Sequence, residues 1–136
     1  MAFQFRQEVL FRHCDPARIV FYPRYFEMLN DCVEALFATM PGHTFADMHA
    51  NRAVPTARIE TEFLAPSRLG DVLEFTLTFP RVGRSSLHTR FVATCDGETR
   101  LRAASVIVHV GTGLRPAPWP EDARAALMAH HEETSQ

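Results

Sequence analysis

Hydrophobic and polar residues alternate along five stretches of the chain, which is the pattern of β-strands that bury one face. A strong two-residue turn signal, Asp96-Gly97, separates the last two stretches, and Val82-Gly83 separates the third stretch from the fourth. Strands joined by such short turns run antiparallel. We therefore expect antiparallel strands near residues 3–11, 57–63, 73–79, 86–94 and 99–110.

A helical period replaces this alternation between residues 22 and 38. Apolar side chains recur there at the i, i+3, i+4, i+7 spacing, which places them on one face of a helix. Pro41-Gly42 ends this helix, and residues 43–52 form either a loop or a short extra helix. A proline-rich linker leads to a second helix from about residue 121 to residue 131. The order of elements predicts an α+β fold in which a long helix packs on one face of an antiparallel sheet.

The composition fits a single small domain spanning residues 1–136. A hydrophobic content of 46% is enough to bury a core without disulfides or a metal. The net charge of −2 gives no field for binding nucleic acid. Three cysteines, an odd number without CxxC spacing, favour a reduced compartment. Because we find neither a signal-peptide h-region nor an apolar run of the ~20 residues that cross a membrane, we expect a cytoplasmic protein without a membrane partner.

The segment from Arg12 to Tyr25 carries the strongest chemical signal. Asp15-Pro16 is a turn signal, and it places one carboxylate just ahead of a helix that opens at Tyr22-Pro23. A helix N-terminus offers unpaired backbone N–H groups and a partial positive charge. A carboxylate beside it supplies a nucleophile or base next to an anion-stabilising hole, which is what acyl transfer needs. Spacing alone leaves open that Asp15 merely shapes the turn.

This segment resembles the 4-hydroxybenzoyl-CoA thioesterase family of hotdog-fold proteins. The shared motif comprises Asp15-Pro16-Ala17, the run from Ile19 to Pro23, the aromatic Tyr25 and the amphipathic helix that follows. The likeness continues through Gly70-Asp71 and Arg84-Ser85-Ser86, so it covers nearly the whole chain. It implies a hotdog fold, a five-stranded antiparallel sheet wrapped around a long central helix, with a short C-terminal helix.

Two positions depart from the family pattern. His13 stands where members usually carry Asp or Glu, and Arg18 stands where many have Gly. The arginine suggests a solvent-facing position. His13 either lies close to Asp15 and holds it as a carboxylate, or turns toward the core or solvent without a chemical role. We favour the second interpretation, because Asp15-Pro16 breaks the strand that would place both side chains on one face.

The resemblance also implies a function, the hydrolysis of an acyl- or aroyl-CoA thioester to free acid and coenzyme A without a cofactor. The carboxylate of the motif acts as nucleophile or general base, and the backbone N–H at the helix start polarises the carbonyl. Aromatic residues of the helix and the loop at 43–52 line the acyl pocket. Relatives join their sheets edge to edge with sites at the subunit boundary, so we expect a homodimer or homotetramer. The implied site residues are Asp15 and Tyr22 for catalysis and Tyr25, Phe26, Arg84 and Ser85 for substrate binding.

Five arginines fall on strands that we expect to pair around the Val82-Gly83 turn, and together they favour a phosphate-bearing ligand such as coenzyme A. They are Arg81, Arg84, Arg90, Arg100 and Arg102.

Two other functions stay open. One is a hotdog dehydratase or hydratase that uses His13 as its base, and the other is a non-catalytic acyl-CoA-binding protein. The seven histidines include no HExxH motif and none at zinc-ligand spacing from a cysteine, so we expect no metal site.

Overall fold

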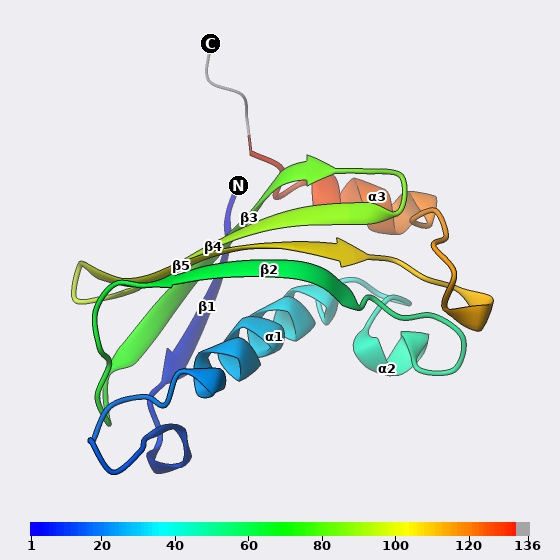
Figure 1. Cartoon of the computed structure of the whole chain (residues 1–136). Helices are drawn as coiled ribbons and strands as arrows, with labels where there is room; N and C mark the ends of the chain where they lie inside the picture. Colours follow the sequence, from blue (N-terminus) through cyan, green and yellow to red (C-terminus); the bar gives the residue numbers. More distant parts are fainter. Residues whose placement is uncertain (133–136) are drawn as a thin grey trace.

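The computed structural model describes residues 1–132 and has the predicted α+β architecture (Figure 1). Its five strands form one antiparallel sheet in the order β1-β3-β4-β5-β2. The strands are β1 (Phe3–Glu8), β2 (Thr56–Phe63), β3 (Val72–Val82), β4 (Ser86–Cys95) and β5 (Glu98–Val108). The helices are α1 (Pro23–Phe37), α2 (Phe45–Met48) and α3 (Glu121–Met128), with short 3-10 helices η1 (Phe11–His13) and η2 (Thr112–Leu114).

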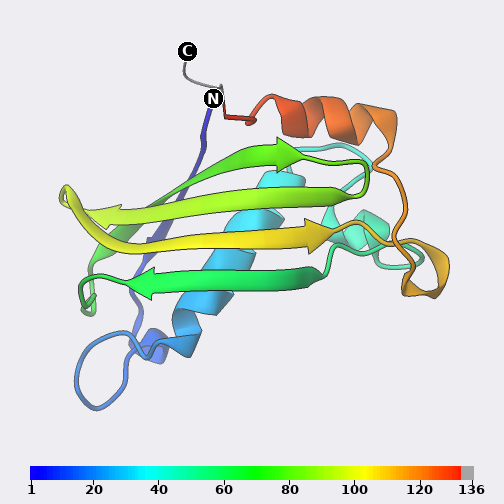
Figure 2. The ribbon, with the colours of Figure 1, turned by 45° about the horizontal axis from the view of Figure 1, so that its top comes forward.

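The core lies between α1 and the face of the sheet that the helix crosses (Figure 2). Cys32, Leu36 and Phe37 of the predicted helical stripe are at most 1% exposed. Opposite them, Phe75 and Phe91 fill the inner face of the sheet. Burying one side chain of this size contributes about 1.5–3 kcal/mol, so this packing holds α1 against the sheet. Within residues 1–132, no helix is both long and apolar enough to cross a membrane.

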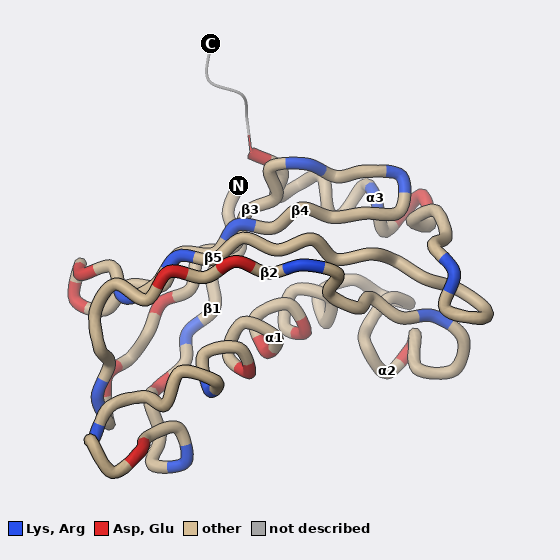
Figure 3. The backbone as a smooth tube through the Cα atoms, viewed as in Figure 1, with Lys and Arg blue, Asp and Glu red and all other residues tan. Residues whose placement is uncertain are grey.

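The edge strand β2 differs from the other long strands in burial. Inward-facing side chains of β3, β4 and β5 are buried, whereas Ile59 and Phe63 of β2 remain 40% and 47% exposed. The outward positions of β2 carry charges, including the ion pair of Arg58 with Glu60 (Figure 3). Because β2 pairs with β5 alone among the described strands, its other edge presents free backbone groups. Such an edge is a template for pairing with another strand.

Two predicted elements end earlier than their patterns indicate. The first strand stops at Glu8, because the Leu10 N–H donates to Nδ1 of His13 at 2.8 Å and the chain turns into η1. The last helix stops at Met128, because the residues after it hydrogen-bond with Phe79 of β3. In both places a hydrogen bond outside the periodic element overrides the local pattern.

The segment 43–52 contains the short helix α2, one of the two alternatives that its sequence leaves open. Thr44 and Asp47 build its first turn by exchanging two hydrogen bonds. The Asp47 N–H donates to Oγ1 of Thr44 at 3.0 Å, and the Thr44 N–H donates to Oδ2 of Asp47 at 3.1 Å. This reciprocal pair is a capping box, which stabilises a helix start.

Candidate active site

Asp15 begins a tight turn between η1 and α1. Its carbonyl accepts the N–H of Arg18 at 2.9 Å, and its own N–H donates to the carbonyl of Ile19 at 3.0 Å. The carboxylate oxygen Oδ1 accepts the N–H of Ala17 at 2.8 Å. The side chain therefore does shape the turn. It does so with one oxygen, and Oδ2 has no hydrogen-bond partner among residues 1–132.

Arg18 closes this turn with a left-handed backbone, at a φ of 68°. That conformation favours glycine because a side chain crowds the following carbonyl. It is the physical reason why a glycine suits this position in relatives. The Arg18 side chain is exposed, as predicted.

The turn belongs to a closed loop, residues 13–21, that leads directly into α1. Cys14 and Val20 form a β-bridge across it, and the Phe21 N–H donates to the His13 carbonyl at 2.9 Å. Tyr22 follows as the N-cap of α1, without a capping side chain. Its backbone N–H has no hydrogen-bond partner in the described part of the chain. The structure thus brings the Asp15 turn and this free N–H onto one loop at the positive end of a helix.

An open apolar hollow of about 560 Å³ adjoins the start of α1. Phe63, at the end of β2, lies at the centre of an aromatic cluster there. Its ring centroid is 6.1 Å from that of Tyr22, 5.6 Å from that of Tyr25 and 6.2 Å from that of Phe26. The cluster combines aromatic surface with high exposure, since Tyr22 is 58% and Phe63 47% exposed. The hollow is lined by Ile19, Val20, Tyr22, Tyr25, Phe63, Leu64, Ala65 and Pro66.

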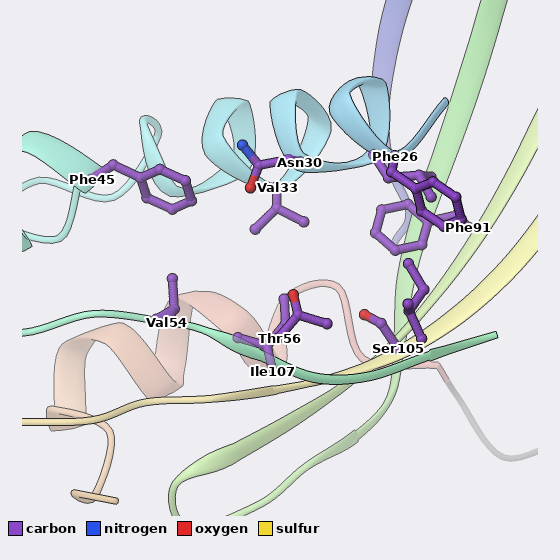
Figure 4. Close-up of a pocket in the computed structure, with 11 residues that line it drawn as sticks. Phe26, Asn30, Val33, Phe45, Val54, Thr56, Phe91, Ser105 and Ile107 are labelled. Carbon is purple, nitrogen blue, oxygen red and sulfur yellow. The ribbon is translucent and has the colours of Figure 1, made fainter. Parts of the chain in front are cut away.

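A second pocket of about 240 Å³ continues along α1, between the helix and strands β2 and β5 (Figure 4). Phe26 lies at one end of it and Phe45 of α2 at the other. Its walls are mainly apolar, with the polar side chains of Asn30, Thr56 and Ser105 among them. Phe26 and the 43–52 segment, both predicted for the acyl pocket, therefore line one cavity, while Tyr25 lines the neighbouring hollow.

Arg84 and Ser85 lie in the turn between β3 and β4, at the other end of the sheet from the Asp15 loop (Figure 2). Their carbonyls accept the N–H groups of Trp119 at 2.9 Å and His109 at 2.7 Å. The Arg84 side chain is exposed. Within one chain, the structure does not bring these two residues together with Asp15 and Tyr22.

The model of the thioesterase-like superfamily matches residues 9–127 of the sequence. This chain belongs to the thioesterase-like superfamily. Solved structures of similar fold include a 1,4-dihydroxy-2-naphthoyl-CoA thioesterase from Synechocystis, with a TM-score of 0.85 and 18% identity over 94% of this chain and 96% of that one. They also include a Staphylococcus aureus protein in complex with CoA, with a TM-score of 0.88 and 17% identity over 100% and 89% of the two chains. A gentisyl-coenzyme A thioesterase has a TM-score of 0.80 and 20% identity over 93% and 99%.

These similarities confirm the hotdog fold. No curated protein sequence matches this chain at a significant level. No group of three or more His, Cys, Asp and Glu side chains among residues 1–132 is arranged to hold a metal ion.

In this thioesterase-like chain His13 is a core residue. It is 1% exposed, and its Nδ1 accepts the Leu10 N–H, so the ring carries its proton on Nε2. Burial lowers the pKa of His13 below its usual range, and the neighbouring Arg12 guanidinium lowers it further. No hydrogen bond joins its ring to Asp15 within the described residues. The structure thus agrees with the interpretation that we favoured, in which His13 faces the core.

The five arginines lie on β3, β4, β5 and the β3–β4 turn, as predicted, but Arg100 and Arg102 lie toward the other end of the sheet from Val82-Gly83. Arg100 lies at the start of β5, and its side chain is 11% exposed and paired with Asp71 at 2.8 Å. Sequence reasoning also missed Phe63 as the centre of the aromatic cluster. Its position in the alternating stretch indicates a strand, but only the sheet order shows that this strand is an edge beside the start of α1.

Proposed function

We propose that this member of the superfamily is an acyl-CoA thioesterase, which hydrolyses the thioester of an acyl- or aroyl-CoA to free acid and coenzyme A. One observation carries the proposal: the loop 13–21 carries the Asp15 carboxylate and leads directly to the unpartnered N–H of Tyr22 at the start of α1. The names of the relatives add support, since two are CoA thioesterases and one was solved in complex with CoA. The reaction needs no cofactor.

In this mechanism the thioester carbonyl oxygen accepts the Tyr22 N–H, where the dipole of α1 stabilises the developing negative charge. Asp15 acts in one of two ways. As a nucleophile it attacks the carbonyl carbon, expels the coenzyme A thiolate and leaves an anhydride that water hydrolyses. As a general base it takes a proton from the attacking water, and the tetrahedral intermediate expels the same thiolate. Either route ends with free acid and coenzyme A.

The acyl group has two neighbouring apolar sites to occupy, both beside α1. One is the hollow at Tyr25 and Phe63, and the other is the cavity between Phe26 and Phe45. Tyr25 and Phe26 act as the first side chains in contact with it. Removing aromatic surface at these positions weakens binding in proportion to the apolar area lost.

The free edge of β2 supports assembly into at least a dimer. Ile59 and Phe63 are too exposed for inward-facing residues of a single chain, and the free backbone groups of the strand lie beside them. Pairing of two β2 strands about a two-fold axis joins the two sheets into one and covers both features. The resemblance to the 4-hydroxybenzoyl-CoA thioesterase family implies a site at such a boundary.

The same pairing gives Arg84 and Ser85 a place in the site. Phe63, at one end of β2, lies on the Asp15 side of the sheet, whereas Thr56 lies on the Arg84 side. Two antiparallel β2 strands set the Thr56 end of one beside the Phe63 end of the other. The β3–β4 turn of the partner then approaches this chain's Asp15 side, where an arginine can bind the phosphates of coenzyme A.

The decisive experiment compares three substitutions in the full-length protein. Asp15→Asn retains an oxygen for the Ala17 N–H and removes only the charge, whereas Asp15→Ala removes both. Asp47→Asn is the matched control, because Asp47 also holds a turn through its side chain but lies in α2. Free thiol release is measured on a panel of aromatic and aliphatic acyl-CoAs. We expect both Asp15 variants to lose about 10²-fold or more in kcat, and the control to match wild type.

Each alternative has its own outcome. Wild-type hydrolysis by a folded Asp15→Asn protein contradicts the assigned role of Asp15. Binding of acyl-CoA without turnover on any chain length identifies a non-catalytic acyl-CoA-binding protein. Interconversion of enoyl- and 3-hydroxyacyl-CoA without thiol release identifies a dehydratase or hydratase.

A further inference from the structure

Arg100 occupies a β-bulge near the start of β5. Ala93 of β4 pairs with Leu101, but the next residue, Thr94, pairs with Thr99, so Arg100 has no partner on β4. A bulge of this kind re-aims the side chain of the extra residue. The side chain of Arg100 is 11% exposed, and it faces the loop 64–71 that joins β2 to β3.

Nη1 of Arg100 lies within hydrogen-bond distance of three oxygen atoms of this loop. The Pro66 carbonyl and Oγ of Ser67 each lie at 3.1 Å, and Oδ2 of Asp71 lies at 2.8 Å. The Arg100 carbonyl also accepts the Leu64 N–H at 2.8 Å. Arg100 therefore holds the loop near both of its ends. A guanidinium is suited to this task because its donors are fixed in one plane and can serve several acceptors together.

The charge of Arg100 is matched by two carboxylates, because Asp71 lies 2.8 Å from its Nη1 and Glu98 lies 2.7 Å from its Nε. Its hydrogen bond to Asp71 is the main cause that lowers the pKa of Asp71 below its usual range, so this carboxyl stays ionised at neutral pH. Oδ2 of Asp71 also accepts the Arg68 N–H at 2.9 Å. A buried charge with such partners is stable, whereas removing one partner leaves the other uncompensated.

The loop 64–71 supports the Asp15 turn directly. The Val20 N–H donates to the Ser67 carbonyl at 2.9 Å, and Ile19 forms a β-bridge with Arg68. The Ile19 carbonyl is the acceptor for the Asp15 N–H. A continuous chain of hydrogen bonds thus connects Arg100, Ser67, Val20-Ile19 and Asp15.

The same loop is also fixed to α1 and to the end of β1. The Tyr25 hydroxyl lies close to Ser67, which is 0% exposed. On the other side of the Asp15 loop, the Val9 N–H donates to the Asp71 carbonyl at 2.7 Å, and the Gly70 N–H donates to the Val9 carbonyl at 2.9 Å. The segment that carries Asp15 is therefore attached, on both sides, to the loop that Arg100 holds.

We infer that Arg100 is a positioning residue for the candidate active site: it holds the 64–71 loop so that Asp15 keeps its place relative to the Tyr22 N–H. The inference rests on the proposed function, since it assigns Arg100 to the geometry of that reaction. It also replaces the sequence-based expectation that this arginine binds a phosphate. A group held this way affects the reacting geometry and not the binding of the nucleotide.

The test uses Arg100→Met and Arg100→Lys, with Arg6→Met as the control on another strand of the sheet, because the Arg6 side chain is 70% exposed. We expect Arg100→Met to lower kcat by up to about 10²-fold while KM stays unchanged, since small displacements at a reacting group have effects of that size. Arg100→Lys restores part of the loss through its charge, and the control behaves as wild type. If Arg100→Met does not fold, Ser67→Ala takes its place in the test, because it removes one contact without leaving a buried charge. We expect Ser67→Ala to lower kcat, by less than is expected for Arg100→Met.

Amide hydrogen exchange provides a readout that does not depend on turnover. In Arg100→Met, or in Ser67→Ala, we expect faster exchange at Asp15 and Val20 than in wild type, with protection in β3 and β4 unchanged. A raised KM with unchanged kcat and exchange overturns the inference in favour of a phosphate site. Faster exchange throughout the core, in parallel with the loss of kcat, makes Arg100 a purely structural residue. If wild type hydrolyses no thioester, the proposed function fails, and exchange at Asp15 still decides whether Arg100 positions this loop.

Discussion

An arginine cluster lies at each end of β5, and the two clusters neutralise their charge differently. In the Arg100 cluster the guanidinium is paired with two carboxylates, those of Asp71 and Glu98, and with the hydroxyl of Ser67. In the second cluster, which we call the Arg52 cluster, the guanidinium is hydrogen-bonded to two imidazoles. Nε of Arg52 donates to Nε2 of His109 at 3.0 Å, and Nη2 lies 3.0 Å from Nδ1 of His43. Its members are Arg52, His43, His109 and Asp122.

Both histidines of the Arg52 cluster must be neutral to accept these hydrogen bonds. Nδ1 of His109 donates to the Ala117 carbonyl at 2.8 Å, and Nε2 of His43 donates to Oδ2 of Asp122 at 2.9 Å. The cluster therefore connects the 43–52 segment, the end of β5 and the start of α3. A carboxylate keeps its charge over the whole physiological range, but an imidazole gains a proton just below it. The two ends of the fold should thus respond differently to acid.

The largest effect expected from this comparison follows Arg52→Met. It leaves the acceptor nitrogens of His43 and His109 unpaired, and both residues are buried. With hydrogen bonds to charged groups at about 1.5–3 kcal/mol each, we expect the free energy of unfolding to fall by about 3 kcal/mol. Urea unfolding measures it. Arg58→Met is the control, because the Arg58 side chain is 71% exposed and its loss changes stability by less than about 1 kcal/mol.

Equal losses from the two substitutions would show that the Arg52 cluster contributes no more than a surface ion pair. The Arg52 variant should also keep its kcat when it is assayed below its unfolding transition. This is the contrast with Arg100→Met, which we expect to lower kcat. A loss of kcat in both variants would show that the clusters at both ends of β5 support the candidate active site.

The sequence predicts the strands, the long helix and the Asp15 loop well, for a physical reason. Burial on one face imposes a period of 2 or 3.6 on any strand or helix, whatever lies opposite it. The hydrogen bonds that close the Asp15 loop lie within residues 13–21, so a local motif is enough to specify them. These features need no knowledge of distant partners.

The arginine clusters were beyond such reasoning because their partners are distant. Alternation with Leu101 assigns Arg100 to the outer face of the sheet beside Arg102. The bulge changes this assignment, and its position depends on the register with β4. Asp71 precedes Arg100 by 29 residues, and His43 precedes Asp122 by 79. Contacts at these separations arise from topology, which the order of residue types does not display.

A smaller effect concerns pH. Burial lowers the pKa of His109 below its usual value of 6.5, and the charge of Arg52 lowers it further, against the hydrogen bond to Ala117. As pH falls, the unfolded chain therefore takes up a proton before the folded protein does. The free energy of unfolding is highest above about pH 6.5 and decreases below it, by at most about 1.4 kcal/mol per pH unit for each such histidine.

Urea unfolding between pH 8 and pH 5 tests this slope. The variant His109→Gln should be less stable at pH 8 and lose part of the slope, and the remainder comes from His13, whose pKa is also lowered. The Arg100 cluster adds nothing in this range, because the lowered pKa of Asp71 affects stability only as pH falls below about 4. A slope that His109→Gln leaves unchanged would place the acid sensitivity outside the Arg52 cluster.

The smallest effect concerns Arg84, which lies on the Arg52 side of the sheet but is exposed and belongs to neither cluster. Arg84→Gln should leave stability unchanged and raise KM for acyl-CoA by about five- to tenfold, as expected from one exposed phosphate contact on the order of 1 kcal/mol. We expect kcat to change less, because a contact remote from the carbonyl contributes equally to ground-state and transition-state binding. Arg6→Gln is the control, since the Arg6 side chain is 70% exposed on β1.

An acyl-pantetheine, which lacks the nucleotide, sharpens this test. Wild type should prefer acyl-CoA over the truncated substrate, and Arg84→Gln should prefer it less, because the variant has lost a contact that only the nucleotide provides. Equal losses on both substrates would make Arg84 a structural residue of the turn. Because we propose that Arg84 acts on the partner's site, mixing Arg84→Gln with Asp15→Asn subunits distinguishes the two arrangements. A mixed dimer that retains one site with both residues intact recovers part of the wild-type kcat/KM, whereas sites within single chains give no such recovery.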